Sequence, residues 1–342
     1  MAELTERENF LMLLRGEQPE WVPFYAYGAN PLGTPPPIGN CSPSFLMEHI
    51  MKPGVQRDFW GVNHIPVPDA GGAKIPQTFD FILKDIRDWR DVIKAPDLSG
   101  VDWEMTAKKD IERSPFDRTQ TLITYGLHPG YFQLLASFMG FADGMCAMYE
   151  EPEEVQALIE YLSDFYMDVA RKSIDLYKPD ILSITDDIAT VTNPFFSLEM
   201  YRELFLPYYK QMAQLAIDRG IPCQMHCCGH CEIFIEDWVN ELNVRAWNPA
   251  QTSNDLLAIK EKYRGRLILC GAYDYSKKPL EYNTEEKIKQ SVYDTIDRYA
   301  PGGGYAFAGS FLGPEGDEAT RMKNVWVAEA VADYGRTFYQ TH

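Results

Sequence analysis

Residues 181–228 read ILSITDDIATVTNPFFSLEMYRELFLPYYKQMAQLAIDRGIPCQMHCC. The stretches Ile181–Thr185 and Pro222–His226 are short and apolar, which is typical of strands that are buried on both faces. Between them, Leu198–Arg219 has the length and pattern of a helix, and Ser197 can cap its N-terminus. A strand, a helix and a second strand in this order predict two parallel strands joined by a helical crossover.

The same alternation continues on both sides of this unit. Further strands are predicted at Leu122–Tyr125, Arg245–Trp247, Leu267–Cys270 and Tyr305–Ala308. Further helices are predicted at Pro152–Ile174, Asp255–Tyr263 and Glu285–Tyr299. The first 120 residues can supply the remaining strands, beginning with the run Val22–Tyr27. Because no glycine-rich nucleotide-binding fingerprint follows any strand, an α/β fold with a closed (β/α)8 or TIM barrel is favoured over an open doubly wound sheet.

The N-terminal quarter of the chain has a different character. Residues 28–80 are rich in proline and glycine and lack a clear period, so we interpret them as long loops around a short helix at Ser44–Met51. No linker composition divides the sequence, and residues 1–342 are expected to form one domain. Within it, residues 1–90 would provide an N-terminal extension with a helix and the loops that cover a pocket at the barrel mouth.

The overall composition excludes several classes of protein. The chain has 342 residues, of which 45% are hydrophobic, and its net charge of −18 would repel the phosphate backbone of a nucleic acid. No apolar stretch is long enough to cross a membrane. The first residues, MAELTERENF, lack the basic and apolar regions of a signal peptide. We therefore expect a cytoplasmic protein that binds neither nucleic acid nor a membrane.

The stretch Gln224–Glu232, QMHCCGHCE, directly follows a predicted strand, and the C-terminal ends of barrel strands form the catalytic face. Side chains two residues apart on a strand point the same way, so His226 and Cys228 can contact one metal ion while Cys227 points into the wall. An imidazole and a thiolate together suit zinc, and an open position would make the site catalytic. Cys270 ends another strand at this face and is the candidate third ligand.

Three other interpretations of this stretch remain open. Cys228 and Cys231 have the spacing of a thiol–disulfide motif, although the sequence does not indicate the small domain that usually carries it. The local cysteines and histidines could also form a closed structural zinc site. Buried thiols beside a core histidine are the third alternative. The odd cysteine count of 7, with four of them within nine residues, favours metal or redox chemistry over a disulfide framework.

Polar residues stand at or directly after the ends of several other predicted strands. Asp186 and Asp187 follow Ile181–Thr185, where they could hold a proton, a cationic group or the surroundings of the metal, so we predict both as catalytic residues. Capping of the following loop and helix is the alternative role for an aspartate here. The predicted substrate-binding residues, each of which could instead be part of the wall, are Tyr25, Tyr27, Tyr125, His128, Asn193, Asn248 and Gln251.

Taken in order, a series of segments resembles the uroporphyrinogen decarboxylase superfamily. The segments are Asp58–Gly61, Leu83–Ile86 with Trp89, Asp186–Ile188, Phe196–Lys210, His226–Gly229, Leu267–Asp274 and Pro301–Gly304. The resemblance covers nearly the whole chain and implies a (β/α)8 barrel. Because the superfamily holds both decarboxylases and corrinoid-dependent methyltransferases, the series is specific for the superfamily and not for one activity.

The N-terminal region separates these two branches. The decarboxylases carry an arginine-rich motif that binds the many carboxylates of their substrate, whereas this chain has no arginine between Arg15 and Arg57. An acidic protein that lacks these arginines is poorly suited to such a substrate. The resemblance is therefore closer to the methyltransferase branch, and a metal-independent decarboxylase, a carboxy-lyase, is the alternative.

The methyltransferase branch implies a zinc ion held by a His-x-Cys pair and a later cysteine. His226 and Cys228 match the pair, but Ala308–Ser310 stands where the later cysteine is expected. Cys270, Ser310, an acidic residue or the substrate could take that place.

This resemblance also implies the reaction and its partner. Zinc would act as a Lewis acid while a methyl group moves between a small molecule and the cobalt of a corrinoid (cobalamin). The small molecule would be a methoxylated aromatic compound, a methylamine or a thiol, and the first of these implies O-demethylation. A separate corrinoid-binding protein would carry the cobalt and bind transiently. A homodimer is one oligomeric state that the sequence leaves open.

Overall fold

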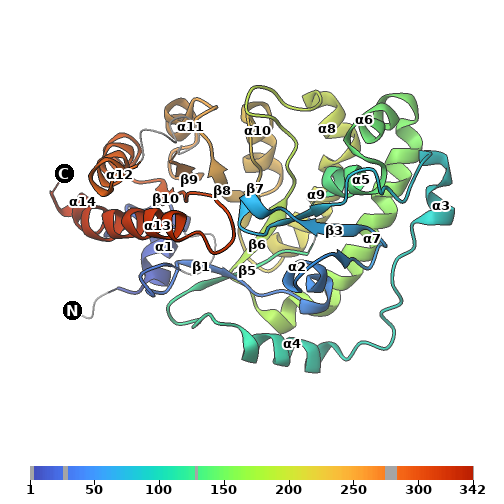
Figure 1. Cartoon of the computed structure of the whole chain (residues 1–342), viewed down its shortest axis with the longest axis horizontal. Coiled ribbons are helices and arrows are strands. Elements are labelled where there is room, and N and C mark those ends of the chain that lie inside the picture. Colours follow the sequence, from blue (N-terminus) through green and yellow to red (C-terminus); the bar gives the residue numbers. More distant parts are fainter. Residues whose placement is uncertain (1–3, 26–29, 128–129, 274–282, 342) are drawn as a thin grey trace.

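The computed structural model of the chain describes residues 4–25, 30–127, 130–273 and 283–341. Its central element is a sheet of seven parallel strands, which pair in the order β1-β5-β6-β7-β8-β9-β10 (Figure 1). The strands are β1 (Ile38–Asn40), β5 (Leu122–Tyr125), β6 (Ile181–Thr185), β7 (Cys223–His226), β8 (Val244–Ala250), β9 (Ile268–Ala272) and β10 (Tyr305–Ala308). All C-terminal strand ends therefore meet at one edge of the sheet.

The sheet is curved, as one long-range hydrogen bond demonstrates. Phe24 forms a parallel bridge with Phe307, so the segment around Phe24 runs beside β10. The hydroxyl of the adjacent Tyr25 nevertheless donates to Gln224 Oε1 on β7 at 3.2 Å, although β10, β9 and β8 stand between this segment and β7 in the strand order. Since neighbouring strands lie about 4.8 Å apart, a flat sheet would put Gln224 out of reach. The observed fold is thus a curved sheet of seven strands with an eighth segment beside its last strand.

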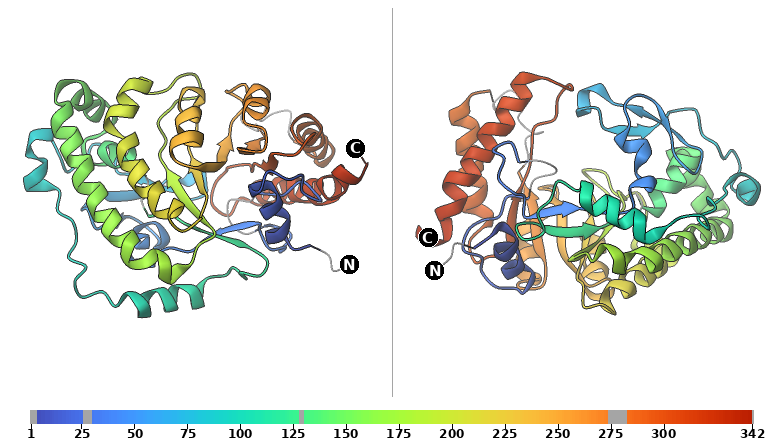
Figure 2. Two further views of the ribbon diagram at one scale, coloured as in Figure 1. Left: turned by 180° about the vertical axis from the view of Figure 1, so that it is seen from behind. Right: turned by 90° about the horizontal axis from the view of Figure 1, so that it is seen from below.

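The helices that connect the strands lie along the outer side of the sheet (Figures 1 and 2), whereas the first helix packs against the interior cluster through Phe10 and Leu13. In chain order, the helices are α1 (Glu6–Leu14), α2 (Glu48–Met51), α3 (Trp89–Val92), α4 (Trp103–Arg113), α5 (Tyr131–Met139), α6 (Phe141–Glu150), α7 (Pro152–Tyr177), α8 (Leu198–Leu204), α9 (Leu206–Ile217), α10 (Glu232–Glu241), α11 (Leu256–Lys262), α12 (Glu285–Tyr299), α13 (Glu318–Ala330) and α14 (Arg336–Thr341). Short helical turns complete the set at Ser44–Leu46, Pro68–Ala70, Ile86–Asp88 and Val331–Gly335. Among the described residues, no helix combines the length and apolar character that a bilayer-spanning segment needs.

Most predicted elements are present, with one informative break. The segment predicted as one helix, Leu198–Arg219, forms α8 and α9, which are separated at Phe205. Pro207 stands in the first turn of α9, where its missing N–H group costs no hydrogen bond. The proline therefore starts a new helix, which the apolar pattern alone did not reveal.

The interpretation of residues 28–80 as loops is corrected by the structure. This segment supplies β1 of the main sheet and a small antiparallel sheet in the order β2-β3-β4. The strands of the small sheet are β2 (Gln56–Arg57), β3 (Asn63–Pro66) and β4 (Lys74–Pro76). Strands of two to four residues are too short to produce a recognisable alternation of apolar and polar residues, which is why the sequence pattern missed them.

Trp60 anchors the small sheet to the helical layer. Its indole is 5% exposed, and its Nε1 donates to the hydroxyl of Tyr166 on α7 at 3.0 Å. The indole also packs against Phe138 on α5 and Phe165 on α7, with ring centroids 6.1 and 5.2 Å away. One aromatic side chain thus connects the turn between β2 and β3 to two helices.

The substitution Trp60→Ala should lower the free energy of unfolding by about 3–5 kcal/mol, because it leaves a large cavity between the small sheet and α7. Trp60→Phe keeps most of the apolar contact and should cost less than the alanine variant, since it removes the indole hydrogen bond and part of the ring. Urea unfolding followed by circular dichroism measures both. Equal stability of Trp60→Ala and the wild type would contradict the anchoring role.

Candidate metal centre

The candidate site lies where β6 and β7 end. Thr185 is paired with His226 in the parallel register of these strands, and the Asp186 N–H donates to the His226 carbonyl at 3.0 Å. Two residues beyond this pair, the backbone N–H of Cys228 donates to Asp187 Oδ1 at 2.7 Å. The strand register therefore brings Asp187 and Cys228 together just outside the sheet.

Asp187, His226 and Cys228 form a group of possible metal ligands. One ligand atom from each, a carboxylate oxygen, an imidazole nitrogen and the thiol sulfur, lies within 4.8 Å of the others. These three kinds of donor are those that zinc accepts, and three protein ligands leave a fourth position for a bound molecule. The donor set and its spacing therefore fit a catalytic zinc ion.

Asn248 holds the imidazole of His226 in place. Asn248 is opposite His226 in the register of β8 against β7, and its Oδ1 lies 2.7 Å from His226 Nδ1. An amide oxygen accepts a hydrogen bond, so Nδ1 carries the proton and Nε2 carries the lone pair that a metal ion requires. Asn248, one of the predicted substrate-binding residues, is 1% exposed, and this hydrogen bond places it to orient the His226 imidazole.

The surroundings of Cys228 favour a cation between it and Asp187. Burial, and then the charge of Asp187, raise the pKa of the Cys228 thiol. A carboxylate and a thiolate side by side repel each other, and a divalent cation bound by both reverses that repulsion. Gln133 on α5 fixes the other carboxylate oxygen, since its Nε2 donates to Asp187 Oδ2 at 3.2 Å.

The neighbouring cysteines pack into the protein instead of facing the site. The Sγ atoms of Cys227 and Cys231 lie 3.4 Å apart, and both residues are fully buried. Burial, and then the neighbouring Cys231 thiol, raise the pKa of Cys227. The thiol–thiol contact in this stretch is thus between Cys227 and Cys231. Of the local cysteines, Cys228 alone belongs to the ligand group with His226.

Cys270, the predicted third ligand, lies in the interior of the curved sheet. It is 0% exposed and belongs to a buried cluster with Tyr25 and side chains from the strands. Burial raises the pKa of its thiol. Cys270 is not a member of the group that contains His226 and Cys228, in which Asp187 is the third possible ligand. The predicted binding residue Tyr25 is likewise an interior residue, 6% exposed and bonded to Gln224.

Asp186 supports a helix and does not face the site. It is 2% exposed, and it accepts hydrogen bonds from the Phe132 and Gln133 N–H groups at 3.0 and 3.1 Å and from the Tyr209 hydroxyl at 2.5 Å. Burial raises the pKa of Asp186 to about 7, although these hydrogen bonds lower it. The carboxylate thus caps the N-terminus of α5, and of the two predicted catalytic aspartates the structure brings Asp187 alone to the ligand group.

Gly130 permits this close approach. Its φ angle is +123°, and a Cβ atom there would lie 2.3 Å from Asp186 Oδ1. Both the backbone conformation and the lack of space therefore require glycine immediately before α5.

The other predicted substrate-binding residues lie in different surroundings. Tyr125 is fully buried, and its hydroxyl is hydrogen-bonded to Ser173 on α7, so it faces the helical layer. Asn193 is exposed in a turn, where its backbone pairs with Thr190. Gln251 lies at the site, and its Oε1 accepts the N–H of Gly229 at 2.7 Å. Tyr27 and His128 lie outside the described residues.

Two cavities meet at the ligand group. One, of about 700 Å³, is lined by His226 and Cys228 together with Gln251, Tyr273 and Ser310. The other, of about 730 Å³, is lined by Asp187 and many apolar side chains. Asp187 therefore borders one cavity while its two partner ligands border the other. Gln133 also lines the second cavity. It was not predicted as a site residue, because no sequence pattern in α5 indicates that it faces a cavity.

The fold has relatives among solved structures. A methyltransferase from Methanosarcina mazei aligns with 97% of this chain and 100% of its own, with a TM-score of 0.62 and 13% sequence identity. A variant of methylaspartate ammonia lyase from Clostridium tetanomorphum aligns with 70% of this chain and 48% of its own, at 11% identity and a TM-score of 0.33, which is too low to support an argument. No curated protein sequence matches the chain.

At the level of sequence families, residues 83–312 match the uroporphyrinogen decarboxylase (URO-D) family. The matched segment includes β5 to β10 and all three residues of the ligand group. It also covers most of the segments on which the resemblance was first based. The chain belongs to the uroporphyrinogen decarboxylase (URO-D) family.

Proposed function

We propose that the chain is a zinc-dependent methyltransferase that moves a methyl group between a small methylated molecule and the cobalt of a corrinoid carried by a partner protein. The observation that carries this proposal is the group of Asp187, His226 and Cys228 at the C-terminal edge of the parallel strands. Zinc bound by these residues would supply Lewis-acid polarisation of the heteroatom that carries or receives the methyl group. The fold shared with a methyltransferase agrees with this assignment.

The residues around the group would keep it in a fixed geometry. Asn248 orients the imidazole of His226, and the Cys228 N–H and the Gln133 amide hold the two oxygens of Asp187. Two of the three ligand side chains, those of His226 and Asp187, are therefore fixed by hydrogen bonds to other residues, as is usual for metal ligands. Because Asp186 is hydrogen-bonded to the first turn of α5, Asp187 is the carboxylate that would also accept or release a proton at the site.

The cavity beside Asp187 favours a substrate with an apolar body. Phe59, Trp60, Phe132 and Phe141 are among its walls. Such walls exclude water and pack against a flat ring, which suits a methoxylated aromatic compound better than a methylamine. We propose this substrate class, with O-demethylation as the direction in which the methyl group leaves the small molecule.

A decarboxylase acting on a substrate with many carboxylates has less support. Among the described residues, no arginine lines either cavity, and the one lysine that lines the second cavity, Lys74, donates to the backbone carbonyls of His49 and Lys52. Several carboxylates would enter these cavities without cationic partners, at a large desolvation cost.

We also propose that Val22–Tyr25 is the eighth strand of a closed (β/α)8 barrel. The bridge between Phe24 and Phe307 puts this segment next to β10. In a closed barrel, the strand that comes first along the chain pairs with the last one in this way. The interior cluster, which joins Tyr25 to Ile38 on β1, supports closure on the other side.

Metal analysis tests the ligand set. Relative to the wild type, His226→Ala, Cys228→Ser and Asp187→Asn should each lose about one zinc ion per chain, because three protein ligands hold it. Cys270→Ala should retain the wild-type amount. Elemental analysis of the purified proteins after removal of unbound zinc measures this. Loss of the ion from Cys270→Ala, with full retention in Asp187→Asn, would show that the interior cysteine is the third ligand instead.

The orientation of His226 by Asn248 can be tested by affinity. The substitution Asn248→Ala should weaken zinc binding at this site by about 10–100-fold, since the imidazole loses the partner that fixes its tautomer. Asn193→Ala, which changes an exposed asparagine in a turn, is the control and should bind zinc as the wild type does. Competition with a chromophoric chelator gives both affinities. Equal zinc affinities of Asn248→Ala and Asn193→Ala would show that Asn248 does not orient His226.

The activity itself is tested with free cobalamin as the acceptor. The wild type should form methylcobalamin from reduced cobalamin and a methoxylated aromatic compound, and Cys228→Ser should be slower by about 100-fold or more, because a Lewis acid contributes several kcal/mol to the barrier. Absorbance of methylcobalamin follows the reaction. Absence of transfer from methoxylated aromatics, methylamines and methylated thiols, together with release of CO2 from a porphyrinogen, would favour the decarboxylase.

A further inference from the structure

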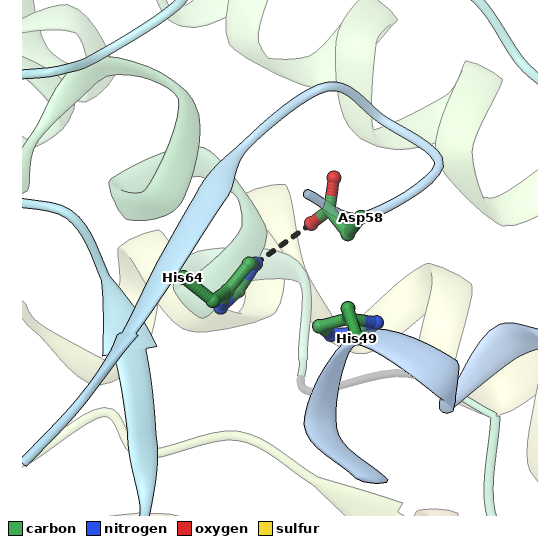
Figure 3. Close-up of side chains that lie close together, drawn as sticks. All are labelled: His49, Asp58 and His64. Atoms are coloured by element: carbon green, nitrogen blue, oxygen red, sulfur yellow. Dashed lines mark hydrogen bonds and ion pairs between the residues drawn. The ribbon is translucent and has the colours of Figure 1, made fainter. Parts of the chain in front are cut away.

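A second group of possible metal ligands lies in the N-terminal part of the chain. His49 is on α2, Asp58 directly follows β2, and His64 is on β3. One ligand atom from each residue lies within 4.8 Å of the others. Figure 3 shows the carboxylate of Asp58 and the ring of His49 on the same side of the His64 imidazole. None of these residues takes part in the site between β6 and β7.

The three side chains are close enough for a shared ion. His64 Nε2 and Asp58 Oδ2 are 2.9 Å apart, and the ring centroids of His49 and His64 are 4.6 Å apart. Two donors bound to one tetrahedral zinc ion lie about 3.3 Å from each other, since each bond is about 2.0–2.1 Å long. Small rotations of side chains would therefore place all three donors around a single ion.

The group is also built into the fold. The side chains of His64 and Asp58 are 12% and 6% exposed. The second oxygen of Asp58 accepts the N–H of Val62 at 2.9 Å, and the backbones of these two residues are hydrogen-bonded as well, so the turn that contains Trp60 fixes the carboxylate. Lys74 on β4 fixes α2, because its ammonium donates to the His49 carbonyl at 2.8 Å.

We propose that His49, Asp58 and His64 bind a divalent transition-metal ion, with zinc as the first ion to test. Two imidazoles and one carboxylate are a common ligand set for such ions, and they leave a coordination position open. The three residues line the same cavity of about 730 Å³ as Asp187, so a molecule in this cavity would have access to the open position. This site does not rest on the proposed methyl transfer, since it shares no ligand with the first group.

Metal binding by the full-length protein tests this site. Wild type, Asp58→Asn, His64→Gln, His226→Ala and the control Asp69→Asn are loaded with zinc or Co2+, freed of unbound metal and analysed for metal content. Asp69 is an exposed carboxylate between β3 and β4, and Asp69→Asn changes the net charge by the same amount as Asp58→Asn. We expect about two ions per chain in wild type and Asp69→Asn, and about one in each of the other variants.

The Co2+ spectra identify the ion that remains. In Asp58→Asn and His64→Gln it should show the sulfur-to-cobalt charge-transfer band of the Cys228 site, and in His226→Ala that band should be lost or weakened. Full metal content in both Asp58→Asn and His64→Gln, or a wild type that binds a single ion lost only in His226→Ala, overturns the second site. A single ion lost only in Asp58→Asn and His64→Gln supports it and instead overturns the zinc site of the proposed function.

Discussion

Thr185 pairs with His226 across β6 and β7, and this register determines which side chains meet at the edge of the sheet. It puts Asp187 beside Cys228, where a backbone hydrogen bond joins them. The register of β8 against β7 places Asn248 opposite His226 in the same way. A shift by one residue would turn each of these side chains to the other face of the sheet, so the ligand group depends on strand pairing more than on any single loop.

The two adjacent aspartates have different partners at this edge of the sheet. Asp186 turns towards α5 and accepts hydrogen bonds from its first turn, while Asp187 turns towards His226 and Cys228. Gln133, in that same first turn, donates to Asp187. The position of α5 is therefore coupled to that of Asp187, because Asp186 accepts hydrogen bonds from the first turn of this helix and Gln133 in the same turn donates to Asp187.

Much of this arrangement follows from local sequence patterns. Short apolar runs that alternate with helical patterns predicted β5 to β10, and the spacing of two residues placed His226 and Cys228 on one side of β7. The pattern could not identify the side of the sheet that each residue faces, so Tyr125 and Cys270 were assigned to the site although one faces α7 and the other fills the interior. Long-range contacts, such as that between Asp187 and Cys228, depend on strand pairing and leave no local signal.

The group of Asp187, His226 and Cys228 is the centre of the functional account, and anomalous diffraction tests it most directly. Crystals of the zinc-loaded protein would be measured above and below the zinc absorption edge. The account predicts an anomalous peak within about 2.0–2.3 Å of a carboxylate oxygen of Asp187, a ring nitrogen of His226 and the sulfur of Cys228. The absence of a peak there, or a peak bonded to the sulfur of Cys270, would contradict it.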